Sequence, residues 1–147
     1  MSIAARKAAI FATEVNFTAN LEDNSSFNAS VTKLESSTTP GRGDIWVVVA
    51  TEWVGGRPRT FTITFSKDKN QATNETVTDQ DLHATLHFND YNDQENPTYQ
   101  KARSGTISYF LDPTTLHFSG SFRVNIDKSD GTGRYACAGE FETDLSR

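Results

Sequence analysis

Residues 116 to 126 carry the most regular pattern in this chain. Apolar or small side chains occupy every second position, and polar side chains stand between them. The first series is Leu116, Phe118, Gly120, Phe122, Val124 and Ile126. A period of two places each series on one face of an extended strand, whereas a helix repeats every 3.6 residues or so. The pattern therefore predicts a sheet with one buried and one solvated face.

Two further regions predict paired strands. The final third is typical of a three-strand meander over 105–111, 116–127 and 134–143, with turns at 112–115 and 130–131. Residues 45–54 are apolar on both faces for most of their length, which predicts a central strand covered on both sides. Gly55-Gly56 turns this segment into a second alternating strand, so residues 45–65 are expected to form the central hairpin.

Weaker alternation predicts strands at 11–19, 27–31 and 82–88 and an edge strand at 75–77, with loops at 35–44 and 89–96. Residues 2–9 could form a short helix capped by Ser2 or lead directly into the first strand. With eight or nine strands and no helix for parallel crossovers, we expect an all-β fold. The pattern leaves open an antiparallel, calycin-like barrel or a two-sheet sandwich.

Size and charge limit the classes of protein. A length of 147 residues is usual for one domain, so residues 1–147 are expected to form a single β domain. Ten Phe, four Tyr and two Trp concentrate the buried apolar surface in a few large side chains. The formal charge of −5 would repel a polyanion, so no nucleic-acid partner is expected. The same acidity keeps an ordinary soluble domain dispersed, so it does not identify a cationic partner.

Cys137 is the only cysteine, which excludes an intrachain disulfide and a cysteine-cluster metal site. Its alternating surroundings predict a core position. The first residues do not resemble a secretory signal and no segment resembles a membrane span, so the cytoplasm is the default location. Unconventional secretion stays open, because four glycosylation sequons begin at Asn16, Asn24, Asn28 and Asn74. Arg42-Gly43-Asp44, a tripeptide that integrins read, is expected in a turn.

No metal or other cofactor is expected. His83 and His87 are four residues apart, which on a strand separates them by about 13 Å, so they cannot share one ion unaided. His117 could add a third imidazole, but no cysteine or HExxH context supports zinc. The loop 90–96 offers oxygen ligands, yet the sixth and twelfth positions lack the Gly and Glu of an EF-hand.

No catalytic residue is assigned, because the chain has no GxSxG, GxGxxG or Walker sequence. Candidate ligand-binding residues are the polar or aromatic side chains of the predicted strands. They are Trp46, Glu52, His83, His87, His117 and Arg123. Glu52 shares a strand face with Trp46, whereas Trp53 lies on the opposite face, so the two indoles cannot form one platform.

Four short segments lie at intervals through the last forty or so residues: Ser104-Gly105-Thr106-Ile107, Leu111-Asp112, Phe118-Ser119-Gly120-Ser121-Phe122 and Gly139-Glu140-Phe141. With these segments the region resembles the closing strands of small bacterial β domains of unknown function with calycin-like or sandwich folds. Such proteins often carry a signal peptide and a lipid-anchored cysteine, and this N-terminus has neither. The resemblance implies a β fold and carries over no functional residue.

Three hypotheses follow for the function. The first is a binding module for a small apolar or carbohydrate ligand, held in the barrel interior or on a sheet face. The second is a structural or interaction domain, which could form a homo-oligomer through sheet edges. The third is a barrel-based hydrolase or isomerase with Glu52, His83, His87 or His117 as acid and base.

Overall fold

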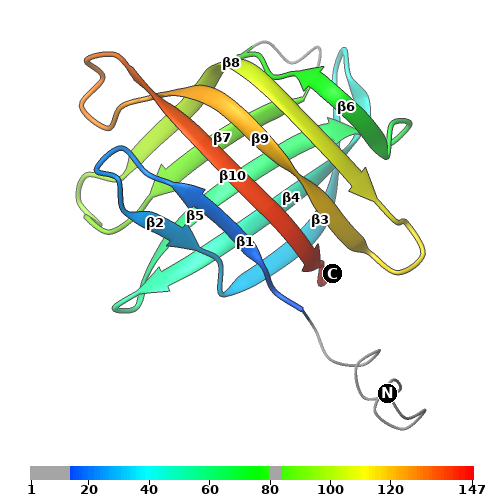
Figure 1. Cartoon of the computed structure of the whole chain (residues 1–147), viewed down its shortest axis with the longest axis horizontal. Helices are drawn as coiled ribbons and strands as arrows, with labels where there is room; N and C mark the ends of the chain where they lie inside the picture. The colour runs from blue at the N-terminus through cyan, green and yellow to red at the C-terminus, as the bar shows by residue number, and fades with distance from the viewer. Residues whose placement is uncertain (1–13, 80–83) are drawn as a thin grey trace, which may run out of the picture.

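The computed structural model describes residues 14–79 and 84–147, and every strand pairing among them is antiparallel. The described residues contain no helix, so the predicted all-β class is confirmed. The possible helix at 2–9 lies outside the described residues. Ten strands follow the chain (Figure 1): β1 (Phe17–Asn20), β2 (Ser26–Asn28), β3 (Val31–Thr39), β4 (Gly43–Val54), β5 (Arg57–Ser66), β6 (Gln71–Thr76), β7 (Thr85–Asp90), β8 (Thr98–Leu111), β9 (His117–Asp127) and β10 (Arg134–Asp144).

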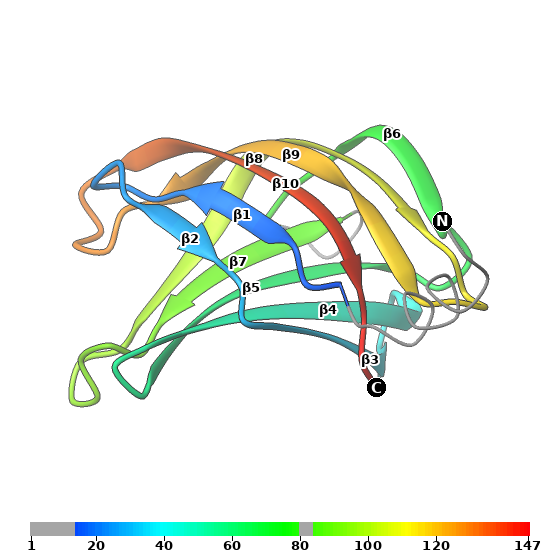
Figure 2. The ribbon, with the colours of Figure 1, turned by 60° about the horizontal axis from the view of Figure 1, so that its bottom comes forward.

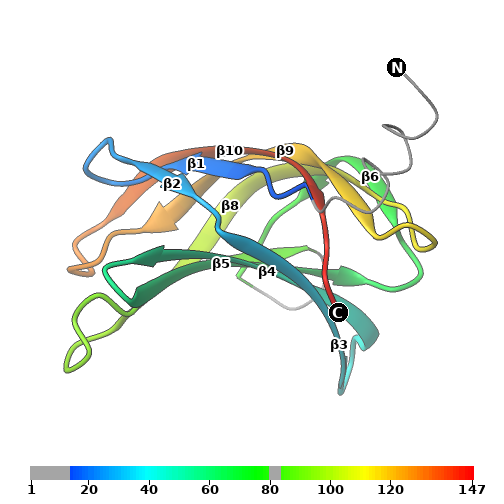
Figure 3. The same cartoon turned by 90° about the horizontal axis from the view of Figure 1, so that it is seen from below.

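These strands form one continuous sheet that curls into a half-barrel. Their order is β2-β1-β10-β9-β8-β7-β5-β4-β3, and β6 pairs with β8 beside this path. The curl brings the β1–β10–β9 side over the β3–β4–β5 side, as Figures 2 and 3 show. The segment that follows β10 then meets β3, where the Leu34 amide donates to the Ser146 carbonyl at 2.7 Å. Neighbouring strands mostly follow one another in the chain, which is why short turns suffice.

The predicted central hairpin is β4–β5. Its register runs from Ile45 opposite Ser66 to Val54 opposite Arg57. Gly55 and Gly56 have φ of 59° and 82°, the left-handed conformation that a two-residue type I′ turn requires at both positions. The expectation that β4 is covered on both sides is wrong. Val48 and Ala50 on its inward face are fully buried, but Trp53 on its outward face is 55 % accessible, because an antiparallel sheet needs cover on one face only.

The predicted loop over 35–44 is also corrected. β3 continues to Thr39 and β4 begins at Gly43, so the turn holds three residues only. Ser and Thr side chains in this part of β3 suggested a loop, but their backbone groups pair with β4, for example Ser36 opposite Trp46. Arg42-Gly43-Asp44 lies at this turn, where Asp44 accepts a hydrogen bond from the Thr38 hydroxyl at 2.7 Å.

The closing meander is β8–β9–β10, as predicted. In β9 the inward residues Phe118, Phe122 and Val124 are buried. Gly120, on the same face, has a φ of 151°, and a Cβ there would lie 2.0 Å from the Ser108 carbonyl oxygen, so only glycine fits. β8 begins at Thr98, earlier than the predicted 105, because a bulge between Ala102 and Ser104 interrupts the alternation that would have revealed it.

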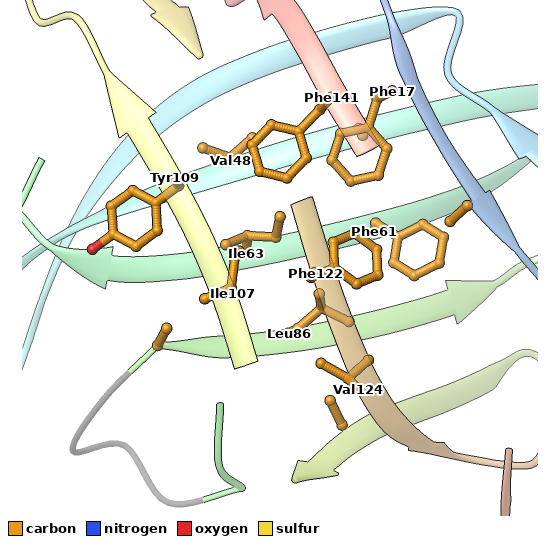
Figure 4. Close-up of a cluster of buried hydrophobic side chains, with 14 of the residues drawn as sticks. Phe17, Val48, Phe61, Ile63, Leu86, Ile107, Tyr109, Phe122, Val124 and Phe141 are labelled. Atoms are coloured by element: carbon orange, nitrogen blue, oxygen red, sulfur yellow. The ribbon is translucent and has the colours of Figure 1, made fainter. Parts of the chain in front are cut away.

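Side chains fill the interior of the half-barrel (Figure 4). Phe61 is fully buried at its centre, with ring centroids of Phe27 and Phe88 both 4.8 Å away. Phe118 stacks on Phe141 at 4.5 Å further along. Cys137 is buried as predicted, and burial raises the pKa of its thiol to about 12. Because the core is filled, space for a ligand inside the half-barrel is left only where the strands end.

Candidate functional site

A pocket opens where four turns gather at one end of the half-barrel, on the left in Figures 1 and 3. These turns join β1 to β2, β4 to β5, β7 to β8 and β9 to β10. The pocket has a volume of about 420 Å³, within the range of 300–1,000 Å³ or so that is common for small-ligand sites. Its lining residues come from both halves of the curled sheet: Leu21, Glu22, Asp23, Arg59, Phe88, Asp90, Thr98, Gln100, Ser129 and Tyr135.

The inner wall of the pocket is rigid and mostly buried. Leu21 and Phe88 are buried and provide apolar surface. Gln100 is buried beside them, and its amide Nε2 donates to the Asp127 carbonyl at 2.7 Å while its Oε1 accepts from Thr98 at 3.0 Å. Because both ends of the Gln100 amide are already bonded, this side chain fixes the wall and leaves recognition to other groups.

Tyr135 has the one pocket-lining hydroxyl in the described residues that is buried without a hydrogen-bond partner. The side chain points inward from β10 because it alternates with the exposed Arg134 and Ala136. Burial raises the pKa of Tyr135 above its ordinary value, so the hydroxyl keeps its proton. A buried, unpaired hydroxyl costs about 1–3 kcal/mol, and a ligand that bonds it would recover this free energy.

Arg59 holds the opposite wall through an ion pair with Glu52. The Arg59 Nε donates to Glu52 Oε1 at 3.0 Å, and the Asn28 amide donates to Glu52 Oε2 at 2.8 Å. Both side chains are mostly shielded, with 16 % and 13 % exposed. Glu52 therefore does not line the pocket itself but positions the guanidinium that does.

The charges around the pocket are mixed. Glu22, Asp23 and Asp90 contribute three formal negative charges and Arg59 one positive charge, which leaves a net formal charge of −2. A hydrogen bond from the Ser25 side chain lowers the pKa of Asp23, which keeps that carboxylate ionised. The pocket thus offers carboxylate acceptors beside guanidinium and phenol donors.

Two of the six sequence-predicted residues lie in β4, at opposite ends. Trp46 and Glu52 are six residues apart, which separates them by about 20 Å along the strand. Glu52 lies beside the pocket, whereas Trp46 lies at the far end, where its Nε1 donates to Asn70 Oδ1 at 3.2 Å. Lys67 covers the Trp46 ring at 4.4 Å, so this indole is already packed.

The described histidines and Arg123 lie elsewhere. His87 faces outward from β7, next to the inward Phe88, and His117 begins β9 with its Nδ1 2.8 Å from Asp144 Oδ1. Arg123 faces outward from β9 and lines an open hollow of about 390 Å³ on the outer face of the sheet. His83 lies outside the described residues. The structure therefore does not bring these candidates together at the pocket.

Within residues 14–79 and 84–147 no group of His, Cys, Asp and Glu side chains could hold a metal ion. Two carboxylates at the turn between β7 and β8 bond to backbone amides of that turn. Asp90 accepts from the Asn92 amide at 2.8 Å, and Asp93 accepts from the Glu95 amide at 3.0 Å. These bonds shape a turn, which explains the acidic composition of the loop without a cation.

Sequence reasoning missed most of the pocket. Tyr135 of β10 and Arg59 of β5 are far apart both in the chain and in the strand order, and only the curl of the sheet brings them together. One signal was available: a two-residue turn at Gly55-Gly56 places Glu52 opposite Arg59, which predicts an ion pair. Nothing in the sequence indicated that this pair borders a pocket.

Searches against family models, curated proteins and solved structures found no match for this chain. The resemblance of the last forty residues to small bacterial β domains therefore stays a prediction. In the part of the chain that the structure describes, no helix is long and apolar enough to cross a membrane. The case for a function consequently depends on the pocket itself.

Proposed function

We propose that this protein is a non-enzymatic binding module that takes a neutral, polyhydroxylated ligand of the carbohydrate class in the pocket at the strand ends. The observation that carries the proposal is the buried, unpartnered hydroxyl of Tyr135 in a pocket that mixes hydrogen-bond donors and acceptors. Sugar hydroxyls both donate and accept, so they match Arg59, Tyr135 and the carboxylates together. The apolar surfaces of Leu21 and Phe88 suit the C–H faces of a sugar ring.

Other ligand classes match the pocket less well. A net formal charge of −2 opposes an anion, and no group of three or more His, Cys, Asp and Glu side chains among the described residues could hold a metal ion. An apolar ligand would need space in the interior, which Phe61 and its neighbouring rings occupy. The candidate acids and bases Glu52, His87 and His117 do not line the pocket, which is the reason for proposing binding without catalysis.

The test is a panel of ligands measured by thermal shift and calorimetry. We expect neutral mono- and disaccharides to raise the melting temperature, whereas sugar phosphates, alkylamines and fatty acids should not. Tyr135→Phe should lower the affinity for the sugar by about tenfold or more, because it removes a hydroxyl that only the ligand bonds.

Tyr109→Phe is the matched control. Tyr109 is a buried tyrosine whose hydroxyl donates to the Lys69 carbonyl at 2.8 Å and lies outside the pocket lining. Its loss should leave sugar affinity unchanged. The proposal fails if no neutral sugar stabilises the wild-type protein at millimolar concentration, or if both tyrosine variants bind the sugar as the wild type does.

A further inference from the structure

Four ring-bearing side chains cross the outer face of the sheet at the pocket end, and we call them the outer ring row: Trp53, Pro58, Tyr91 and Tyr99. Trp53 of β4 lies opposite Pro58 of β5, and the Tyr91 amide donates to the Pro58 carbonyl at 3.1 Å. The rings of Tyr91 and Tyr99 contact each other with centroids 6.0 Å apart. Since adjacent strands are about 4.8 Å apart, the row extends about 14 Å from β4 to β8.

Two members of the row are unusually exposed for side chains of their size. Trp53 is 55 % and Tyr99 67 % accessible, whereas Pro58 and Tyr91 between them are half-buried. A soluble domain rarely leaves several large apolar groups exposed in one place unless something binds there. Phe110, which is 47 % exposed near the other end of β8, belongs to no such group and so provides a comparison.

The surroundings of the row favour a sugar polymer over a second protein copy. The next cross-strand positions on this face are Thr51, Thr60 and Asn89, which offer uncharged hydroxyl and amide groups. The exposed surface of Trp53 and Tyr99 together amounts to roughly 300 Å². This is far below the surface of about 800 Å² that each partner buries in a stable dimer. Flat rings in a line suit the C–H faces of successive sugar units, each ring packing against one unit.

The row is also continuous with the pocket. Arg59 and Asp90 line the pocket, and their chain neighbours Pro58 and Tyr91 belong to the row. Neighbours in a strand point to opposite faces. The pocket and the row therefore lie on opposite sides of one sheet edge, where β5 begins and β7 ends. A chain that enters the pocket with one end can cross this rim and lie along the rings.

We infer that the outer ring row binds a neutral polysaccharide chain whose terminal unit occupies the pocket. For the class of ligand the inference rests on the proposed function, which it extends from a free sugar to a polymer. The row supplies stacking surface, and the pocket supplies the hydrogen bonds that fix the end of the chain. Because the row and the pocket bind the same chain, the affinity for the polymer should exceed the affinity that either site provides alone.

Affinity electrophoresis of the full chain in gels containing β-glucan, mannan or xylan tests the inference. We expect at least one polymer to retard the wild type, and Trp53→Ala and Tyr99→Ala each to weaken that retardation roughly tenfold. The same polymer should retard the Phe110→Ala variant as strongly as it retards the wild type. Circular dichroism and melting temperature check that each variant folds, which the exposure of these side chains leads us to expect.

The outcomes separate the row from the pocket. If short sugars still bind through Tyr135 but no polymer depends on Trp53 or Tyr99, the inference is overturned and the proposed function survives. If a polymer depends on the row while no short sugar binds, the row stands and the proposed pocket function fails. Sedimentation that shows a dimer which Trp53→Ala and Tyr99→Ala dissociate, with no polymer bound, overturns the inference in favour of a self-interface.

Discussion

Two tyrosines with inward-facing hydroxyl groups, the buried Tyr109 and the half-buried Tyr135, show how one hydroxyl group changes what a residue contributes. The Tyr109 hydroxyl donates to a carbonyl, whereas the Tyr135 hydroxyl has no partner among the described residues. Removing the Tyr109 hydroxyl leaves the Lys69 carbonyl unpaired and should cost about 1–2 kcal/mol of unfolding free energy. Removing the Tyr135 hydroxyl should cost nothing or stabilise the fold, so urea denaturation of the two Phe variants complements the ligand test. A polar group that lies in a pocket and lowers the free energy of unfolding indicates a binding residue.

The pair His117 and Asp144 makes a contribution to stability that depends on pH. Their hydrogen bond raises the pKa of His117 above 6.5 and lowers that of Asp144 below 3.8. The His117 contribution is therefore complete below about pH 6.5 and is lost as pH rises through the raised pKa. The Asp144 contribution is complete above about pH 4 and is lost as pH falls through the lowered pKa.

We therefore expect His117→Asn to destabilise the protein more at about pH 5.5 than at about pH 8.5. Both side chains are about one third exposed, so the difference should stay under about 1 kcal/mol and shrink in high salt. Urea denaturation of the wild type and the variant at both pH values measures it. Equal destabilisation at the two pH values would show that the charge of His117 contributes nothing.

At the scale of elements, the segment after β10 closes the half-barrel against β3. Leu145 is buried, the Ser146 amide donates to the Thr32 carbonyl at 2.9 Å, and Ser146 accepts from the Leu34 amide. The edge of β3 would otherwise present unpaired backbone groups there. This contact joins the β10 side of the curled sheet to its β3 edge.

Leu145→Ala should lower the unfolding free energy by about 2–4 kcal/mol, because it leaves a cavity beneath the closing segment. Hydrogen exchange gives the sharper readout. The Leu34 amide should lose more protection than the Ile126 amide, which lies in a strand paired on both sides. Equal loss at both amides would mean that the segment adds global stability without closing the sheet locally.

At the scale of the whole molecule, the filled interior determines where a ligand can lie. Phe61 is fully buried and contacts the rings of Phe17, Phe27, Phe88 and Phe122. Phe61→Ala should cost about 3–5 kcal/mol and open an apolar cavity.

Benzene should then stabilise the Phe61→Ala variant and leave the wild type unchanged in a thermal shift measurement, because an apolar cavity of this size takes an apolar guest. Tyr99→Ala, which removes an exposed ring, is the control and should bind no benzene. Stabilisation of the wild type by benzene would contradict a filled interior. The interior would then be a candidate binding site as well.

Much of the fold was predictable because strand alternation is a local signal. The patterns around Phe122, Phe61 and Phe88 all identified inward positions correctly, and Gly55-Gly56 identified the central turn. The signal failed where it was interrupted or where polar residues occupied a strand. The bulge after Ala102 hid the start of β8, and the Ser and Thr residues of β3 resembled a loop.

The candidate site was hardly predictable, because its residues converge from both halves of the sheet. Glu52 alone among the predicted residues lies beside the pocket, and it was selected as a polar side chain that shares a strand face with Trp46. Tyr135 belongs to no recognisable motif, and no residue near it in the chain predicts that its hydroxyl lacks a hydrogen-bond partner.

By itself the sequence determined the all-β class, the inward faces of most strands and the buried state of Cys137, because each follows from side chains close together in the chain. Only the tertiary structure decided that the sheet curls into one half-barrel and that its interior is filled. It alone brought Tyr135, Arg59 and Asp90 around one pocket. The physical reason is that strand pairing over long separations and the packing of large rings depend on the whole chain at once.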